Sequence, residues 1–186
     1  MHAWKNNMGS YDGQLLADAI RTHANFEQIA QNMFDGEAKV DMSKQGLDAG
    51  DAHIMAAALE KNDTVTQVDA SGNALGNAGA KAFGDSMLVN QTILHLNVSD
   101  NGFGKVQAGD QVKLKDGSVK RVFSTVPNPD YLQLEGDSDS KMYGLSNYTL
   151  VDIGVPAFCA GLAALPQQAS VVCIPAAARG GSRPSG

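Results

Sequence analysis

The chain is poor in cysteine and in positive charge. Only two of its 186 residues are cysteines, Cys159 and Cys173. Two are too few for a disulfide framework, and their spacing matches no metal-binding motif. Both lie in apolar stretches, so we expect buried free thiols in a reducing compartment. The formal net charge is −6, so the surface as a whole does not attract nucleic acid or anionic lipid.

Long apolar segments are also missing. The most apolar tract, residues 151–178, is interrupted by Asp152, Pro156 and Pro166, whereas a membrane-spanning helix needs about 20 uninterrupted apolar residues. Residues 1–14 contain no apolar core and do not resemble a secretory signal. We expect a cytoplasmic protein, with the nucleus as the alternative.

The common catalytic and metal-binding motifs are absent. The four histidines are not spaced for metal binding, and neither the nucleophile elbow G-x-S-x-G nor the phosphate loop G-x-x-x-x-G-K-[ST] occurs. Asp137 and Asp139 resemble a fragment of a calcium loop, but the glycine and glutamate that complete such a loop are missing. We therefore predict a protein that is not an enzyme and that uses no metal or cofactor.

The chain does contain an internal repeat, in rows of equal length that begin VDMSKQGLD, VDASGNALG and LNVSDNGFG at Val40, Val68 and Leu96. Each row opens with the alternation of a short strand. A helical pattern follows, with small or apolar residues at spacing i, i+3, i+4, i+7. The small residues would let each helix lie close to a strand, and Asp48 is placed to cap the first helix. These contact positions are Ala52, Met55, Ala56, Leu59 and Ala80, Phe83, Gly84, Met87.

The rows resemble the leucine-rich repeat of the ribonuclease-inhibitor type, whose pattern is L-x-x-L-x-L-x-x-N-x-L followed by a helix. Residues 65–75 and 93–103 match that pattern. Asn73 and Asn101 stand at its asparagine position, where we expect the amides to bond the backbone of the neighbouring repeat. The resemblance implies an α/β fold: a short leucine-rich-repeat solenoid of parallel strands plus helices over residues 40–104.

The third repeat is interrupted between its strand and its helix. Its contact positions return only at Val155, Phe158, Cys159 and Leu162, much farther from the set that begins at Ala80 than one row length. Residues 105–152 are therefore an insert, and we predict that it is all-β. Asp116-Gly117 between two alternating runs indicates a hairpin, residues 131–134 and 148–153 are further strands, and residues 136–141 form a polar loop. The stretch GDQVKLKDGSVKRV resembles the opening of a small barrel of the Src-homology-3 type.

The ends of the chain complete the expected organisation. Residues 1–39 form an N-terminal helical cap, with one apolar stripe at Leu15, Leu16, Ala19 and Ile20 and a second at Phe26, Ile29, Ala30 and Met33. Residues 153–176 are the resumed repeat, whose final strand follows a slip of three residues. Residues 177–186 form a disordered tail. A truncated or decayed repeat protein stays open as an interpretation.

In the family that the rows resemble, the strands line the concave side, which commonly binds protein partners. Polar residues would form a grid there, because neighbouring strands lie about 4.8 Å apart. The resemblance implies a non-catalytic interaction or scaffold protein inside a larger assembly, with an unidentified protein partner. The predicted partner-binding residues are Lys39, Asp41, Gln67, Asp69, Ser71, His95, Asn97 and Ser99.

The insert offers a different function. Residues 105–121 include five basic and two acidic residues. Basic strands with exposed aromatic rings can bind RNA or modified peptides, but we expect these rings to form the core of the insert. The acidic second half of the insert disfavours nucleic acid, and we expect neither a nucleic-acid nor a membrane partner. The aromatic residues concerned are Phe123, Tyr131, Tyr143 and Tyr148.

Overall fold

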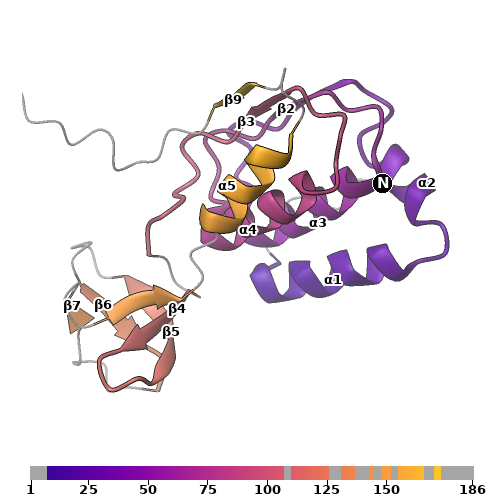
Figure 1. The fold of residues 1–186 in the computed structure, drawn as a ribbon. Coiled ribbons are helices and arrows are strands. Elements are labelled where there is room, and N and C mark those ends of the chain that lie inside the picture. Colours follow the sequence, from indigo (N-terminus) through magenta and orange to yellow (C-terminus); the bar gives the residue numbers. More distant parts are fainter. Residues whose placement is uncertain are drawn as a thin grey trace, which may run out of the picture.

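The structure of the protein is a computed structural model with a mixed α/β fold (Figure 1). A parallel sheet is covered by helices, and a second sheet, antiparallel, lies beside this body. The mixed α/β class predicted from the sequence is confirmed. The structure describes residues 8–106, 110–125, 131–136, 143–144, 148–151, 155–165 and 170–172.

The parallel sheet aligns equivalent positions of the repeated rows. Its strands are β1 (Lys39–Asp41), β2 (Gln67–Asp69), β3 (His95–Asn97) and β9 (Ser170–Val172), in that order. Val40 pairs with Val68, Val68 with Leu96, and Leu96 with Val171. The predicted alignment of the three rows is therefore confirmed. The predicted slip before the last strand is wrong. Val171 comes as many residues after its partner Leu96 as Val155 comes after Ala80, so the strand and the helix after the insert keep the register of the earlier rows.

Three helices cover one face of this sheet (Figure 1): α3 (Ala49–Lys61), α4 (Gly76–Met87) and α5 (Val155–Ala164). Asp48 caps α3 as predicted. Its carboxylate accepts a hydrogen bond from the backbone N–H of Asp51 at 3.0 Å, and the carboxylate of Asp51 accepts one from the N–H of Asp48 at 3.1 Å. This reciprocal pair satisfies two of the amide groups that a helix start leaves without partners.

The small residues of α4 serve contacts between helices. A Cβ atom placed on Gly79 would lie 3.0 Å from the Cβ of Ala52 in α3, and one on Gly84 would overlap the backbone of Ala157 and Phe158 in α5. Gly161 of α5 meets the backbone of Gly84 in the same way. The expectation that these positions bring the helices close to the strands is therefore wrong for Gly84. Its missing side chain makes room for the next helix.

Asparagine side chains join neighbouring units at the ends of the strands. The Asn73 amide donates to the carbonyl of Met42 at 2.9 Å, and its oxygen accepts from the N–H groups of Gln45 and Leu47. Asn101 is buried and donates to the carbonyl of Ala70 at 2.9 Å. The predicted structural role of Asn73 and Asn101 is confirmed, because both amides satisfy backbone groups of the preceding row.

A second pair of asparagines does the same work where the helices end. Asn62 donates to the carbonyl of Ala30 at 3.1 Å, and Asn90, one row later, donates to that of Leu59 at 2.7 Å. Each side-chain oxygen accepts the N–H of the apolar residue three positions on, at 2.7 Å for Val65 and 3.0 Å for Ile93. Both asparagines are buried, so the spacing of the rows also repeats at the helix ends.

The N-terminal helix α1 (Ser10–Thr22) packs against α3 on the side that faces away from the sheet (Figure 1). A Cβ atom on Gly13 would overlap the backbone of Gly50 in α3, and one on Gly50 would overlap the backbone carbonyl of Met8 just before α1. Gly13 and Ala17 are buried, Leu16 and Ile20 pack against the core, and Leu15 is 52% exposed. The predicted stripe is thus wrong at Leu15 and Ala19, because the contact is centred on the glycine.

The second helix, α2 (Phe26–Asn32), lies at the β1 end of the fold and packs on α3. Of its predicted stripe, Ala30 and Met33 are buried, Ile29 packs against the core, and Phe26 is half-buried.

Cys159 of α5 is exposed, so the expectation of a buried thiol is wrong there. Cys173, the fragment at Asp137 and the tail 177–186 lie outside the described residues.

The insert forms the antiparallel sheet, whose order is β7-β6-β5-β4-β8. The hairpin at Asp116 is confirmed: its carboxylate accepts from the N–H of Ser118 at 2.9 Å, and Gly117 adopts a φ of +86°. Within the described residues β7 and β8 do not pair, so no closed barrel is seen. Strand β7, next to the expected polar loop, was not predicted. The strands are β4 (Gln111–Leu114), β5 (Val119–Thr125), β6 (Tyr131–Leu134), β7 (Tyr143–Gly144) and β8 (Tyr148–Val151).

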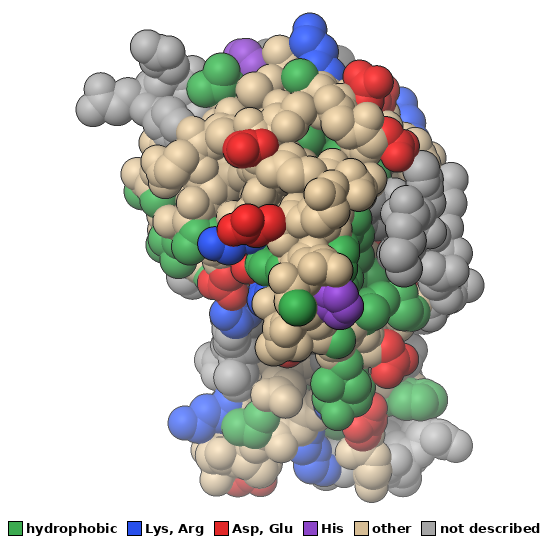
Figure 2. Space-filling view, turned by 90° about the vertical axis from the view of Figure 1, so that its right-hand side faces the viewer, with side chains coloured by type: hydrophobic (Ala, Val, Ile, Leu, Met, Phe, Trp, Pro, Cys, Tyr) green, Lys and Arg blue, Asp and Glu red, His purple; other side chains and the backbone are tan. Residues whose placement is uncertain are grey.

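Two surface properties complete the description. None of the described helices combines the length and the hydrophobicity needed to cross a membrane. On the face shown in Figure 2, acidic and basic side chains are interspersed rather than gathered by sign. The net charge of −6 is therefore not concentrated in the coloured part of this face.

Candidate binding face on the parallel sheet

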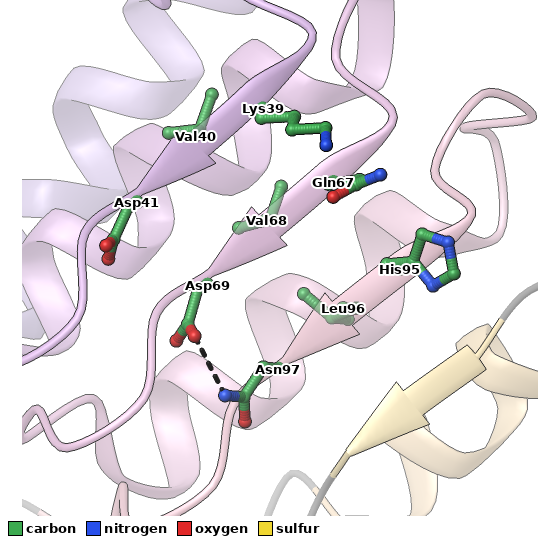
Figure 3. A pocket seen from close by; sticks show the side chains of 9 residues that line it. All are labelled: Lys39, Val40, Asp41, Gln67, Val68, Asp69, His95, Leu96 and Asn97. Carbon is green, nitrogen blue, oxygen red and sulfur yellow. Dashed lines mark hydrogen bonds between the residues drawn. The ribbon is translucent and has the colours of Figure 1, made fainter.

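Two rows of polar side chains cross the parallel sheet (Figure 3). The first and third residues of each strand point to the open side, and the middle residues point toward the helices. Val68 and Leu96 are 3% and 1% exposed. The first row is Lys39, Gln67 and His95, and the second row is Asp41, Asp69 and Asn97. The structure thus brings together six of the eight predicted binding residues, and it places Ser71 and Ser99 just beyond the second row.

The side chains of the second row also end the strands. Asp41, Asp69 and Asn97 each accept a hydrogen bond from the backbone N–H two residues on, at 2.9, 2.9 and 3.2 Å. These are Asx turns, which give the backbone an alternative to continuing the strand. This structural role was missed in the sequence. The spacing of an Asp or Asn two residues before Ser43, Ser71 and Ser99 is the signal that could have shown it.

The serines are occupied by the same turns. The hydroxyl of Ser71 donates to Asp69 at 2.6 Å, and that of Ser99 donates to Asn97 at 2.9 Å. Asn97 in turn donates to the second carboxylate oxygen of Asp69 at 3.0 Å, which is the dashed line in Figure 3. The side chains of Ser71, Ser99 and Asn97 therefore form hydrogen bonds within the face itself.

These hydrogen bonds hold the two carboxylates in the charged state. The pKa of Asp41 is lowered by the bond from the Ser43 N–H and then by the Ser43 side chain. Burial alone would raise the pKa of Asp69. The bonds from Ser71 and Asn97 together outweigh burial, so its pKa is lowered as well. The second row consequently carries two negative charges on adjacent strands at neutral pH.

The first row has a different character. Lys39 and His95 are exposed and Gln67 is half-buried, and the row brings one positive charge and two hydrogen-bonding groups to the face. Among the described residues, the side chains of Lys39 and Gln67 make no hydrogen bond. The two rows line an open hollow of about 380 Å³ over the strands. The face can therefore bind a polar surface that carries charges of both signs.

The loop beyond the second row has the same backbone conformation in every unit. Lys44, Gly72 and Asp100 occupy the same position of three successive units and have φ values of +53°, +67° and +56°. This left-handed region is open to glycine and costs other residues about 1–2 kcal/mol. The loop therefore has the same backbone shape in all three units. In the sequence only Gly72 indicates this conformation, because the other two positions hold Lys44 and Asp100.

The described residues contain no group of three or more histidine, cysteine, aspartate or glutamate side chains placed to hold a metal ion. The face offers carboxylates, amides and an imidazole, which form hydrogen bonds and ion pairs. A comparison with known protein families and with curated protein sequences finds no match to this chain. A function is therefore inferred from the residues and their geometry alone.

Proposed function

We propose that the protein is a short leucine-rich-repeat solenoid that acts as a non-catalytic interaction or scaffold protein and binds a protein partner through the two rows. One observation carries this proposal: equivalent polar positions of three strands, one from each repeated unit, lie side by side in parallel register. Regular stacking of this kind builds an extended surface from small units.

The charges of the face indicate the chemistry of the partner. Asp41 and Asp69 present two carboxylates on adjacent strands, so a partner should place arginine or lysine side chains over the second row. Lys39 and Gln67 in the first row then contact acidic or amide groups of the same partner. The interface would be small and polar, which suits a subunit held by further contacts inside a larger assembly.

Affinity purification with mass spectrometry tests the proposal. The variant Lys39→Glu/Gln67→Arg changes two side chains without internal hydrogen bonds, so the fold should be unaffected. We expect it to lose the partner that the unchanged chain captures. Changing Asp69→Arg and Asn97→Arg should also abolish capture, but that variant additionally breaks the turns that end the strands.

We call the open side of the parallel sheet, with its two rows of polar side chains, the strand face. The control is Lys61→Glu, which reverses an exposed charge in the last turn of α3, away from the strand face. It should retain the partner. Capture that survives Lys39→Glu/Gln67→Arg would contradict the proposal. Loss confined to changes at Lys113, Lys115 or Tyr131 would assign that partner to the insert instead.

A further inference from the structure

The antiparallel sheet of the insert has an outer face that differs in chemistry from the strand face. Val119, Arg121 and Phe123 alternate along β5, and Lys113 of β4 pairs with Val119. All four are exposed, with Phe123 at 64% and Val119 at 51%. We call these four residues the module face. The expectation that Phe123 belongs to the core of the insert is wrong, since that core consists of Val112, Leu114, Val122 and Leu134.

The backbone directs Phe123 outward. Phe123 follows the buried Val122 along β5, so the alternation of the strand points its ring to the outer face. The pairing of β5 with β6 shifts register between Val122 and Ser124. An aromatic ring would gain free energy from burial, so its exposure on the same side of β5 as Val119 provides two apolar contact points with Arg121 between them.

The module face carries positive charge. Lys113 and Arg121 have no ion-pair partner among the described residues. Arg121 and Gln111 also line a cleft of about 590 Å³ together with Tyr11 and Gln14 of α1. Tyr11 is 69% exposed, so the module face continues into a cleft with a second accessible aromatic ring.

We propose that the module face binds an extended peptide in which an acidic residue has apolar residues two positions before and after it. Residues on one side of a strand repeat every two positions, about 6.6–7 Å. An extended peptide has the same period, so its apolar, acidic and apolar side chains match Val119, Arg121 and Phe123 in turn. Lys113 strengthens the attraction for the acid, and the cleft beside Arg121 receives the continuing chain.

A peptide fits this surface better than single-stranded nucleic acid. Proteins that bind single strands use basic grooves and several stacking rings, whereas the four residues of the module face include a single ring, Phe123. Glu135, whose N–H bonds the carbonyl of Arg121 at 2.9 Å, adds an exposed acidic residue beside the module face. This carboxylate repels a polyphosphate, which carries a charge at every nucleotide, more strongly than a peptide with a single acid.

Selection from a displayed library of random peptides on the full chain tests the proposal. Enriched peptides should contain Asp or Glu with aliphatic or aromatic residues two positions away. With one enriched peptide made synthetically, fluorescence anisotropy should show that Phe123→Ser and Arg121→Glu each weaken peptide binding by about tenfold or more. Replacing the acid of the peptide by lysine should restore binding to Arg121→Glu.

Matched controls separate this inference from the proposed function. Lys39→Glu on the strand face should leave peptide binding unchanged, and thermal unfolding should show that the two surface variants are folded. Enriched peptides without acidic residues, or peptide affinities that neither variant changes, would overturn the proposal. So would binding of oligouridylate with the same dependence on Phe123 and Arg121, which would identify a nucleic-acid surface.

Discussion

At the residue scale, the repeated asparagines hold the units together. Asn101 is 2% exposed and donates to three backbone carbonyls, those of Ala70, Val98 and Ser99. Its oxygen accepts from the N–H of Leu75. A buried polar group that loses its partner costs much more than an average hydrogen bond contributes. The repeat therefore depends on a few amides as well as on its apolar positions.

Asn101→Ala should lower the free energy of unfolding by about 2–3 kcal/mol, because it leaves buried backbone groups without partners. Urea denaturation measures the loss. Asn25→Ala is the matched control, since Asn25 is exposed and makes no side-chain capping bond. A loss at Asn101 no larger than that of the control would show that the amide has no structural role.

His53 makes stability depend on pH. It belongs to α3 and faces α1, where Ser10 Oγ is 3.1 Å from its Nε2. Burial lowers the pKa of His53 below its ordinary value of 6.5, and the nearby charge of Arg21 lowers it further. The unfolded chain therefore takes up this proton more readily, so the contribution is present above pH 6.5 and is lost as the pH falls below it.

His53→Gln should consequently flatten the dependence of unfolding free energy on pH between about 7.5 and 5.5. The comparison is with the slope of the unchanged chain. Urea denaturation over a series of buffers gives both slopes. Equal slopes in His53→Gln and the unchanged chain would mean that another group titrates.

At the scale of the elements, α4 and α5 approach each other through glycine. A Cβ atom on Gly84 would overlap the backbone of α5 at Ala157, and one on Gly161 would overlap the backbone of Gly84. The rings of Phe103 and Phe158 meet edge to face at 5.4 Å. This contact joins the helix that follows the insert to the helix that precedes it. The helical spacing in the sequence identifies Gly84 as a contact position but does not identify Gly161.

Gly84→Ala should destabilise the protein. Alanine favours a helix over glycine by about 1 kcal/mol, but overpacking of a close contact costs about 1–3 kcal/mol or more, and here the obstacle is backbone. We expect a net loss, measured as a lower midpoint of thermal unfolding. Asp85→Ala on the exposed side of α4 should change stability by less than about 0.5 kcal/mol. An unchanged or higher midpoint for Gly84→Ala would contradict the observed contact.

Much of the architecture follows from local pattern, and the remainder depends on which elements meet. The alternation at Val68 and the helical spacing at Phe83 predict their strand and helix because both patterns depend only on nearby residues. The predictions that Leu15 and Cys159 are buried are wrong, because burial on a helix depends on which distant element packs against that side of it. Of the candidate site, the positions of both rows were predicted. The turns at Asp69 and Asn97 were not, although they are local and the serine two residues on is a signal for them.

At the scale of the whole molecule, the insert interrupts the chain without disturbing the stack. Leu96 and Val171 pair as directly as Val68 and Leu96 do, although the whole insert separates them in the sequence. Asn77 of α4 accepts from the N–H of Gly104 and donates to Asp110, and so fastens the start of the insert. The insert and the parallel sheet have separate hydrophobic clusters.

Separate cores predict that the stack tolerates removal of the insert. Replacing residues 107–152 by a short glycine-serine linker should leave a folded chain with one cooperative thermal transition. Circular dichroism should show the helices retained. A chain without a cooperative transition would mean that the parallel sheet needs the insert to form.

The central claim is that the strand face, built from units of equal length, contacts the partner. A photo-crosslinking amino acid in place of Gln67 tests this most directly, with the same substitution at Lys61 and at Phe123 for comparison. We expect crosslinks to the captured protein from position 67 and none from position 61. Crosslinks that form only from position 123 would contradict it.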